Sequence, residues 1–293
     1  MTVPTVRILH PGDEEALEAF LLPRVEYSMF LLSNMRQSGL EDTGQPYTGT
    51  YAAAFEGQRM VGVVAHYWNG NLTLQAPEHV LALCKAAVQA CGRSVSGFIG
   101  PLEQVETARL ALCPSSAEVQ MHETELHYAL DLKDLAVPRI LTSGQVSGRR
   151  AEPCDLDLLT RWRVAYSIEA VGDQESPELW ESAARHMKRL QQQGRTWVLE
   201  EGGEPLACCS FNAAIEEAVQ LGGVWTPPHL RCRGHGRAVV AASLLDARED
   251  GVANAILFTG DGNLAAQTAY LALGFQQVGS YCLLLLRQPI RLD

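Results

Sequence analysis

The stretch GGVWTPPHLRCRGHGRAVV, residues 222–240, combines a strand-like start, a glycine-rich turn and the beginning of an apolar helix. Gly222 to Thr226 favour an extended chain, two prolines end it, and the helix is expected near Ala238. Glycines let the backbone approach a ligand closely, and the free amides at a helix start attract an anion. The stretch therefore predicts an anion-binding turn that suits a pyrophosphate.

The turn RCRGHG fits the pattern [QR]-x-x-G-x-[GA], and VWTPP resembles the strand end that precedes it in GCN5-related N-acetyltransferases, the GNAT superfamily. A β-like run at 255–259, then Asn263, then the helix-like LAAQTAYLALGF follow in the order which that superfamily shows. The P-loop and the dinucleotide-binding motif fit worse, because the chain lacks a Gly-Lys-Ser/Thr end and a clean acidic residue closing a second strand. By resemblance the chain is identified as a member of the superfamily.

Composition limits the partners and the location. The net charge of −11 and the pI near 5.2 argue against nucleic acid or an anionic membrane, because phosphate contacts draw on Lys and Arg. The eight cysteines show neither metal-ligand spacing nor a short disulfide framework, so they are read as reduced core thiols and no metal is expected. The start lacks signal-peptide features and the apolar run 282–287 is too short for a bilayer, so a cytoplasmic location is expected.

The chain reads as two halves with one plan, repeated at a period of roughly 150 to 160 residues. Each half is predicted to be α/β, a mixed and mostly antiparallel twisted sheet flanked by helices, as the GNAT resemblance implies. The predicted division is a domain at 1–140, a linker at 141–148 marked by Thr, Ser and Gly, and a domain at 149–293. The closing strands at 275–279 and 281–286 are expected to pair across to the other half.

The two halves differ where the cofactor would bind. In place of the glycine-rich turn the first half has APEHVLALCKAAV, which offers no glycine and places Glu78 near the expected pyrophosphate. Where the second half has Tyr270, the first has Arg109, which stays protonated and cannot serve as an acid. The first half is therefore expected not to hold the cofactor in this mode. In this respect the chain resembles tandem superfamily members in which one domain has lost catalysis, such as mycothiol synthase and the glycine N-acyltransferase type.

The resemblance implies roles for the second half. The strand end at 224–226 would pair with the pantetheine arm of acetyl-CoA, and the Val224 amide would point at the thioester oxygen. Gly222 and Gly223 support this, because glycine within a strand often marks a bulge or a close backbone approach. Tyr270, seven residues after Asn263, would protonate the leaving thiolate. Asn263 would cap the helix. The predicted cofactor-binding residues are Val224, Trp225, Thr226, Arg231, Cys232, Arg233, Gly234, His235, Gly236, Arg237, Asn263 and Tyr270.

The general base is where the sequence departs from the superfamily pattern. Many relatives carry Glu on the fourth strand, whereas this chain has Gln220, whose amide cannot accept a proton. Either a chain of water molecules or another carboxylate would then serve. Glu169 is the preferred carboxylate, because the end of the first helix lines the acceptor site in the superfamily. Its rivals are Glu216, Glu217 and Asp261. His229 and His235 lie beside the phosphate turn and are expected to be too far from the thioester.

The predicted function is an N-acetyltransferase that moves an acetyl group from acetyl-CoA to a primary amine by direct attack, without a cysteine nucleophile. The acceptor is a small molecule or a peptide, and neither its identity nor the oligomeric state can be read from the sequence. The alternative is a non-catalytic acyl-CoA-binding sensor or interaction module, suggested by the missing Glu on the fourth strand. A longer acyl group is a third possibility, against which Trp225 would argue if it faced the thioester.

Overall fold

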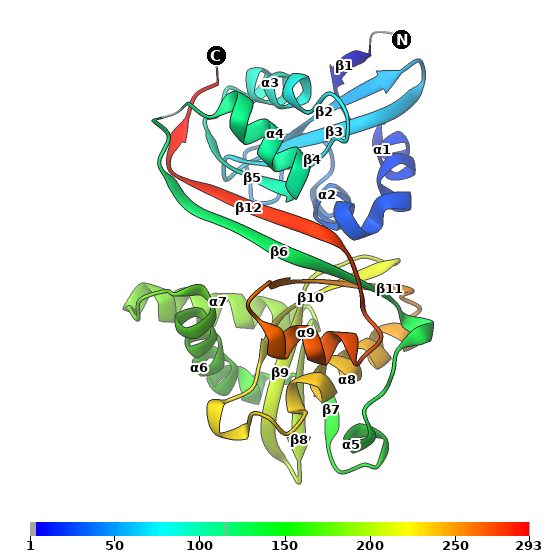
Figure 1. Cartoon of the computed structure of the whole chain (residues 1–293), viewed down its shortest axis with the longest axis vertical. Coiled ribbons are helices and arrows are strands. Elements are labelled where there is room, and N and C mark those ends of the chain that lie inside the picture. The colour runs from blue at the N-terminus through cyan, green and yellow to red at the C-terminus, as the bar shows by residue number, and fades with distance from the viewer. Residues whose placement is uncertain (1–3, 115, 293) are drawn as a thin grey trace. The chain divides into compact units, whose positions relative to one another are not determined.

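The structure, a computed structural model, describes residues 4–114 and 116–292, which form an α/β chain (Figure 1). The chain divides into two compact units. The first unit comprises residues 1–127 and 279–293, and the second comprises residues 128–278. The glycine-rich turn at 231–236 lies in the second unit.

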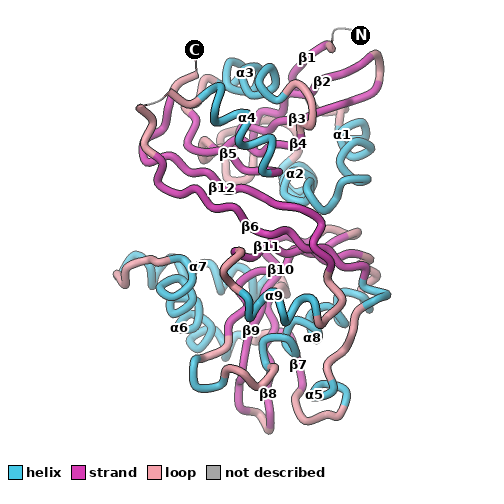
Figure 2. The backbone as a smooth tube through the Cα atoms, viewed as in Figure 1, coloured by secondary structure: helices cyan, strands magenta, loops and turns pink. Residues whose placement is uncertain are grey.

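The second unit contains a mixed sheet in which antiparallel pairing dominates. Figure 2 shows its strands in magenta. Four strands pair antiparallel in chain order: β7 (Ser147–Arg150), β8 (Thr196–Glu201), β9 (Glu204–Ala214) and β10 (Ala218–Trp225). β11 (Asn254–Gly260) then pairs parallel with β10. The helical segments are η2 (Leu132–Asp134), α5 (Arg139–Thr142), η3 (Pro153–Asp155), α6 (Leu156–Tyr166), the π-helical η4 (Ser167–Val171), α7 (Pro177–Gln192), η5 (Pro228–Leu230), α8 (His235–Glu249) and α9 (Leu264–Leu271).

The first unit repeats this plan. Its antiparallel strands are β1 (Thr5–Ile8), β2 (Gly49–Glu56), β3 (Arg59–Tyr67) and β4 (Asn71–Gln75), and β5 (Val95–Pro101) pairs parallel with β4. Its helical segments are α1 (Glu14–Leu21), η1 (Leu22–Arg24), α2 (Val25–Ser38), α3 (Val80–Cys91) and α4 (Leu102–Leu112). In both units helices follow the first, fourth and fifth strands, which confirms the predicted fold class.

Two long strands contribute residues to both units: β6 (Val119–Asp131) and β12 (Gln276–Ile290). Within the first unit β12 lies between β5 and β6, and its residues 281–285 pair antiparallel with residues 97–101 of β5. Cys282, Leu284 and Leu286 of β12 are buried in the core of that unit. The expected pairing of the closing segment with the first half is confirmed, although the two predicted strands form one.

Helices cover both faces of the second unit's sheet, because successive strand residues point to opposite faces. Cys208 of β9 packs with Leu159 of α6 and Met187 of α7. Its neighbour Cys209 donates its thiol hydrogen to the carbonyl oxygen of Val239 in α8, with an S···O distance of 3.5 Å. The chain therefore passes from β10 into α8 on the face opposite α6 and α7.

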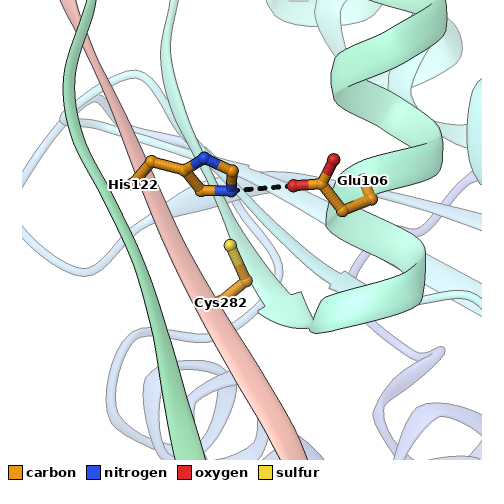
Figure 3. Close-up of side chains that lie close together, drawn as sticks. All are labelled: Glu106, His122 and Cys282. Carbon is orange, nitrogen blue, oxygen red and sulfur yellow. Dashed lines mark ion pairs between the residues drawn. The ribbon is translucent and has the colours of Figure 1, made fainter. Parts of the chain in front are cut away.

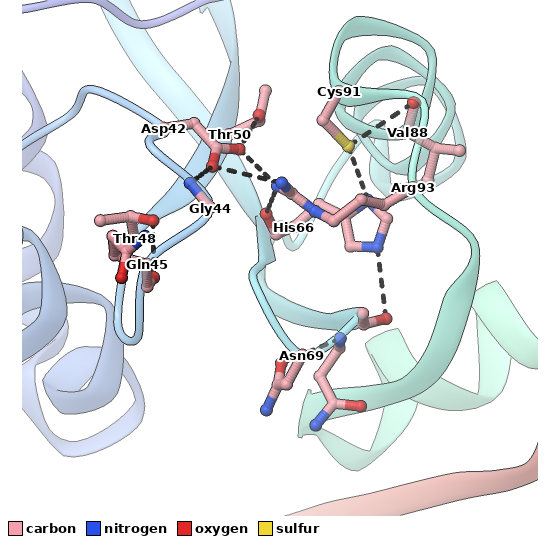
Figure 4. Close-up of polar contacts among 12 residues, drawn as sticks. Asp42, Gly44, Gln45, Thr48, Thr50, His66, Asn69, Val88, Cys91 and Arg93 are labelled. Atoms are coloured by element: carbon pink, nitrogen blue, oxygen red, sulfur yellow. Dashed lines mark hydrogen bonds and ion pairs between the residues drawn. The ribbon is translucent and has the colours of Figure 1, made fainter.

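The first unit contains a partly buried polar network (Figure 4). Arg93 Nη1 lies 3.2 Å from Asp42 Oδ1, and the Thr50 hydroxyl donates to Asp42 at 2.6 Å. Arg93 also donates to the carbonyl oxygen of His66 at 2.8 Å, and Cys91 Sγ lies 3.1 Å from His66 Nδ1. Burial, aided by the nearby Arg93, lowers the pKa of His66 to about 4, so that its imidazole is neutral at pH 7.

The observed elements differ from the prediction in three places. α8 begins at His235 rather than near Ala238. The predicted linker at 141–148 holds the end of α5 and the start of β7, while the compact units change at residues 127/128 and 278/279. β6 was not predicted, because its exposed first half shows little alternation of buried and exposed residues.

No helix within residues 4–114 or 116–292 combines the length and hydropathy needed to cross a bilayer.

Candidate functional site

The strand that leads into the glycine-rich turn is bulged. β10 pairs with β11 only from Ala218 to Leu221, and its register with β9 shifts between Gly222 and Trp225. Gly223 has φ of +59°, a left-handed conformation that favours glycine. The bulge expected at the two glycines is therefore confirmed, and the backbone around Val224 departs from regular pairing with both neighbouring strands.

The turn itself is shaped by left-handed residues. Cys232 has φ of +62°, and Gly234, the residue that precedes α8, has φ of +82°. At Gly236, in the first turn of α8, an added Cβ would meet Thr226 Oγ1 at 3.5 Å and Val224 Cγ1 at 3.9 Å. These are ordinary contacts, so folding alone does not require glycine at position 236. The α8 N-terminus therefore faces the bulged end of β10 with no side chain at this point.

Arginines around the turn supply positive charge. Arg231 donates through Nε to the carbonyl oxygen of Thr226 at 2.9 Å, and its guanidinium lies 4.8 Å from the Trp225 ring centroid. Arg237 extends from the first turn of α8, and its Nε is buried without a hydrogen-bond partner among the residues described. Arg233 makes a 3.5 Å contact with the carbonyl oxygen of His229. An anion at the helix start would therefore find a donor not yet used, on Arg237.

Asn263 takes the structural position that the sequence anticipated, whereas the catalytic role predicted for Tyr270 stays a prediction. Asn263 caps α9, its Oδ1 accepting a hydrogen bond from the amide of Ala266 at 3.2 Å. Tyr270 is 8 % exposed and packs edge-on against Phe275, with ring centroids 5.9 Å apart. His235 is buried, and burial lowers its pKa.

The carboxylate proposed as base has a cationic partner. Glu169 lies in η4 at the end of the first long helix, and its Oε1 is 2.7 Å from Arg231 Nη1. Gln220 is buried in β10, where its amide donates to the carbonyl oxygen of Leu221 at 2.7 Å. Of the rival carboxylates, Glu216 and Asp261 are exposed. The structure therefore brings together two predicted site residues, Glu169 and Arg231, which the sequence analysis had placed in separate roles.

A small cavity of about 10 Å³ adjoins the bulge, and the sequence analysis missed three of its polar residues: Arg163, His186 and Asn212. Its walls also include Gly223 and Trp225, so it lies beside the strand end expected to hold the thioester. Burial, followed by the charge of Arg163, lowers the pKa of His186 to about 4. His186 could have been found, since it lies three residues after Ala183 and four before Leu190, both buried on α7.

In the first unit, a cavity of about 1010 Å³ lies at the place that corresponds to the end of β10 and the start of α8 in the second unit. Residues from the end of β4, the start of α3 and the β5–α4 junction line it, and none of the lining residues is Lys or Arg. His79, with φ of +61°, precedes α3, and the Ala76 amide donates to Gln104 Oε1 at 2.7 Å. Arg109 pairs with Glu106 at 2.7 Å. The expectation that this half does not hold the cofactor through its phosphates stays a prediction.

The chain matches a known protein family and resembles several solved structures. A model of the Acetyltransferase (GNAT) family matches residues 156–275, which include β10, the turn, α8 and α9. No curated protein matches the chain. A Drosophila protein of known structure has a TM-score of 0.63 at 14% identity, covering 97% of this chain and 99% of the other.

Two further solved structures resemble the whole chain. A GCN5-related N-acetyltransferase from Sphaerobacter thermophilus has a TM-score of 0.55 at 14% identity, covering 98% of this chain and 96% of its own. A tandem GNAT protein from the clavulanic acid biosynthesis pathway has a TM-score of 0.53 at 13% identity, covering 96% and 97%. At these identities the likeness is one of fold. The family match places a GNAT acetyltransferase domain at residues 156–275.

Proposed function

We propose that the second unit binds acetyl-CoA and that the protein transfers the acetyl group to a primary amine of a small molecule or a peptide. GNAT proteins are acyltransferases that use acyl-CoA, and the choice of acetyl and of an amine acceptor belongs to the proposal. One observation carries it: left-handed Cys232 and Gly234 precede α8, which follows the bulged end of β10 after the short segment η5. A bulge followed by a glycine-rich helix start suits a ligand with an extended arm and a phosphate end.

The residues present fit that cofactor. The amides at the start of α8 and the Nε of Arg237 suit the phosphates, because each offers a hydrogen-bond donor near the positive end of the helix dipole. Arg231 adds a guanidinium beside Trp225 and Thr226. The predicted set also includes Arg233, Gly236 and Asn263, which the turn and the cap of α9 supply.

The chain supplies two of the groups that acyl transfer needs. When bound, acetyl-CoA provides an acetyl group activated as a thioester. The Val224 amide at the bulge would donate a hydrogen bond to the carbonyl oxygen, where negative charge develops. The Tyr270 hydroxyl would hold the proton for the departing sulfur.

The third group, a base for the amine proton, is proposed to be Glu169. Its carboxylate forms an ion pair with Arg231. A phosphate that binds Arg231 would compete for the guanidinium and free the carboxylate. His186 is a second candidate, because its neutral imidazole lines the cavity that also contains Gly223 of the bulge. Both side chains can accept a proton, which the Gln220 amide cannot.

Calorimetric titration with acetyl-CoA and CoA tests the cofactor site. A variant at Gly234 would strain the turn whatever its role, because that residue has φ of +82°. Gly236→Glu is the sharper variant, since the Cβ fits and the added carboxylate repels phosphate. Gln192→Glu, on the exposed end of α7, adds the same charge elsewhere. Binding to wild type and to Gln192→Glu but not to Gly236→Glu is expected. Equal binding by all three would overturn the proposed site.

The competing function is a non-catalytic acyl-CoA-binding module, which the buried Gln220 in place of a carboxylate favours. Release of free CoA thiol from acetyl-CoA, measured with and without a panel of primary amines, separates the two functions. Amine-dependent release supports transfer. Tight binding of acetyl-CoA without release by any amine favours the module.

A further inference from the structure

Three side chains with metal-ligand atoms meet in the first unit, away from the proposed acyl-transfer site (Figure 3). They are Glu106 of α4, His122 of β6 and Cys282 of β12. One carboxylate oxygen, one imidazole nitrogen and the thiol sulfur all lie within 4.8 Å of one another. Figure 3 shows the sulfur directed toward the space beside the imidazole and the carboxylate. Three strands or helices therefore converge on one point with three different donor atoms.

The carboxylate of Glu106 uses both of its oxygens. Glu106 Oε1 lies 2.7 Å from His122 Nε2, an ion pair when that imidazole is protonated. The other oxygen, Oε2, accepts from Arg109 Nε at 2.9 Å and from Nη2 at 2.7 Å. Arg109 thus orients the carboxylate through one oxygen and leaves the second directed at the histidine and the thiol.

The donor set selects a class of metal. Thiolate sulfur, imidazole nitrogen and carboxylate oxygen together are ligands of Zn²⁺ and of its spectroscopic substitute Co²⁺, whereas Mg²⁺ and Ca²⁺ prefer oxygen alone. One thiolate and one carboxylate would bring two negative charges to a divalent ion, and Arg109 offsets part of the carboxylate charge. Three protein ligands leave a fourth tetrahedral position open to water or another small ligand.

We propose that Glu106, His122 and Cys282 form a site for a zinc-type divalent ion with one open coordination position. The site differs from the acyl-transfer site in residues and in unit, so either can fail without the other. A second group, formed by Glu56, Glu78 and His79, contains no thiol and serves as an internal contrast.

Binding is coupled to loss of a proton. The entering ion forms a metal–sulfur bond, the S–H bond breaks, and the proton passes to the buffer.

Titration of the full-length, metal-free protein with Co²⁺ under a non-coordinating reductant tests the site. A near-ultraviolet sulfur-to-cobalt charge-transfer band should appear, saturate at one equivalent and disappear when Zn²⁺ is added. Cys282→Ala and His122→Gln should abolish or weaken the band. The His122 side chain is 39% exposed. His122→Gln is therefore expected to fold even if Cys282→Ala, which changes a buried residue, does not. Cys113→Ala, a half-buried thiol at the end of α4, should leave the band unchanged.

The outcomes are decisive in either direction. A band that requires Cys282 and His122 supports the site. The proposal is overturned if no band appears in the wild-type protein, if the band survives in Cys282→Ala, or if it depends on Cys113 alone. Cobalt absorption without a sulfur band would place the ion at oxygen and nitrogen ligands, such as the second group, and would also overturn it.

Discussion

Arg231 Nη1 lies 2.7 Å from Glu169 Oε1, and Arg231 Nη2 lies 3.0 Å from Oε2, so the guanidinium and the carboxylate meet through two contacts. This pair joins the glycine-rich turn to the end of the first long helix of the second unit. Both side chains are more than a third exposed, so solvent limits its contribution to stability. We propose a functional role for the pair, because a residue expected to bind phosphate holds the residue expected to take a proton.

Replacing Glu169 separates its two possible roles. If Glu169 is the base, Glu169→Gln should lower kcat about 100-fold, within the usual effect of a general base. Acetyl-CoA affinity should stay equal or rise, since Arg231 loses a competitor for the phosphate. Steady-state kinetics and calorimetry, with His186→Gln as the parallel variant, provide the check. Unchanged kcat with altered affinity would assign Glu169 to positioning Arg231 only.

Tyr270→Phe removes one hydroxyl and keeps the ring that packs against Phe275. We expect kcat to fall by about 100-fold while acetyl-CoA binding and the melting temperature change little. Thiol-release kinetics and differential scanning fluorimetry measure the two effects. A Tyr270→Phe protein with wild-type kcat would exclude the hydroxyl as the acid.

Gly97 of β5 has no room for a side chain, because an added Cβ would lie 2.5 Å from the backbone oxygen of Leu284 in β12. Gly97→Ala should therefore lower the free energy of unfolding by about 1–3 kcal/mol, the usual cost of overpacking. Urea unfolding measures it. Gly262→Ala is the matched control, since nothing lies within 4 Å of its Cβ position. Equal stability of both variants would contradict the observed pairing of β5 with β12.

A fragment of residues 149–293 should not fold as a stable unit. It would retain β12 without β5 and β6, the strands that flank it in the first unit, and would expose Leu284 and Leu286. Circular dichroism and size-exclusion chromatography of the fragment, compared with the full chain, would measure this. A soluble, cooperatively folded fragment would show that β12 is dispensable outside the first unit.

Acid should destabilise the protein between about pH 6.5 and pH 4, because burial lowers the pKa of His66 to about 4. The pKa of His66 is lower in the folded state than in the unfolded state, so the unfolded state binds more protons in this window. The free energy of unfolding therefore decreases as the pH decreases. His66 alone would remove on the order of 2 kcal/mol between pH 6.5 and 5. Urea unfolding at both pH values tests this, with His66→Gln expected to show a smaller pH-dependent loss.

The sequence predicted those elements whose signals are local. α3 runs from Val80 to Cys91 as expected, and Asn263 caps α9, because periodicity and cap preference act within a few residues. The bulge at Gly222 and Gly223 was expected for the same reason. These features depend on residues that are close in the sequence and not on contacts between distant segments of the chain.

Contacts between residues distant in the chain could not be predicted from the sequence. Glu169 and Arg231 are 62 residues apart, and nothing in either segment indicates that they meet. His186 lies far in sequence from Gly223, and only packing of α7 against the sheet places both around one cavity. The meeting of Glu106, His122 and Cys282 also depends on the strand order, in which β12 lies between β5 and β6.

The position of β12 sets an order of events during synthesis. Residues up to 127 leave the ribosome early, but the strand that fills the gap between β5 and β6 is made after the whole of the second unit. Domains generally fold as their chain emerges. The sheet of the first unit therefore stays incomplete, with its core exposed, while the second unit forms. Nascent chains of this protein should need protection from aggregation until residue 290 is released.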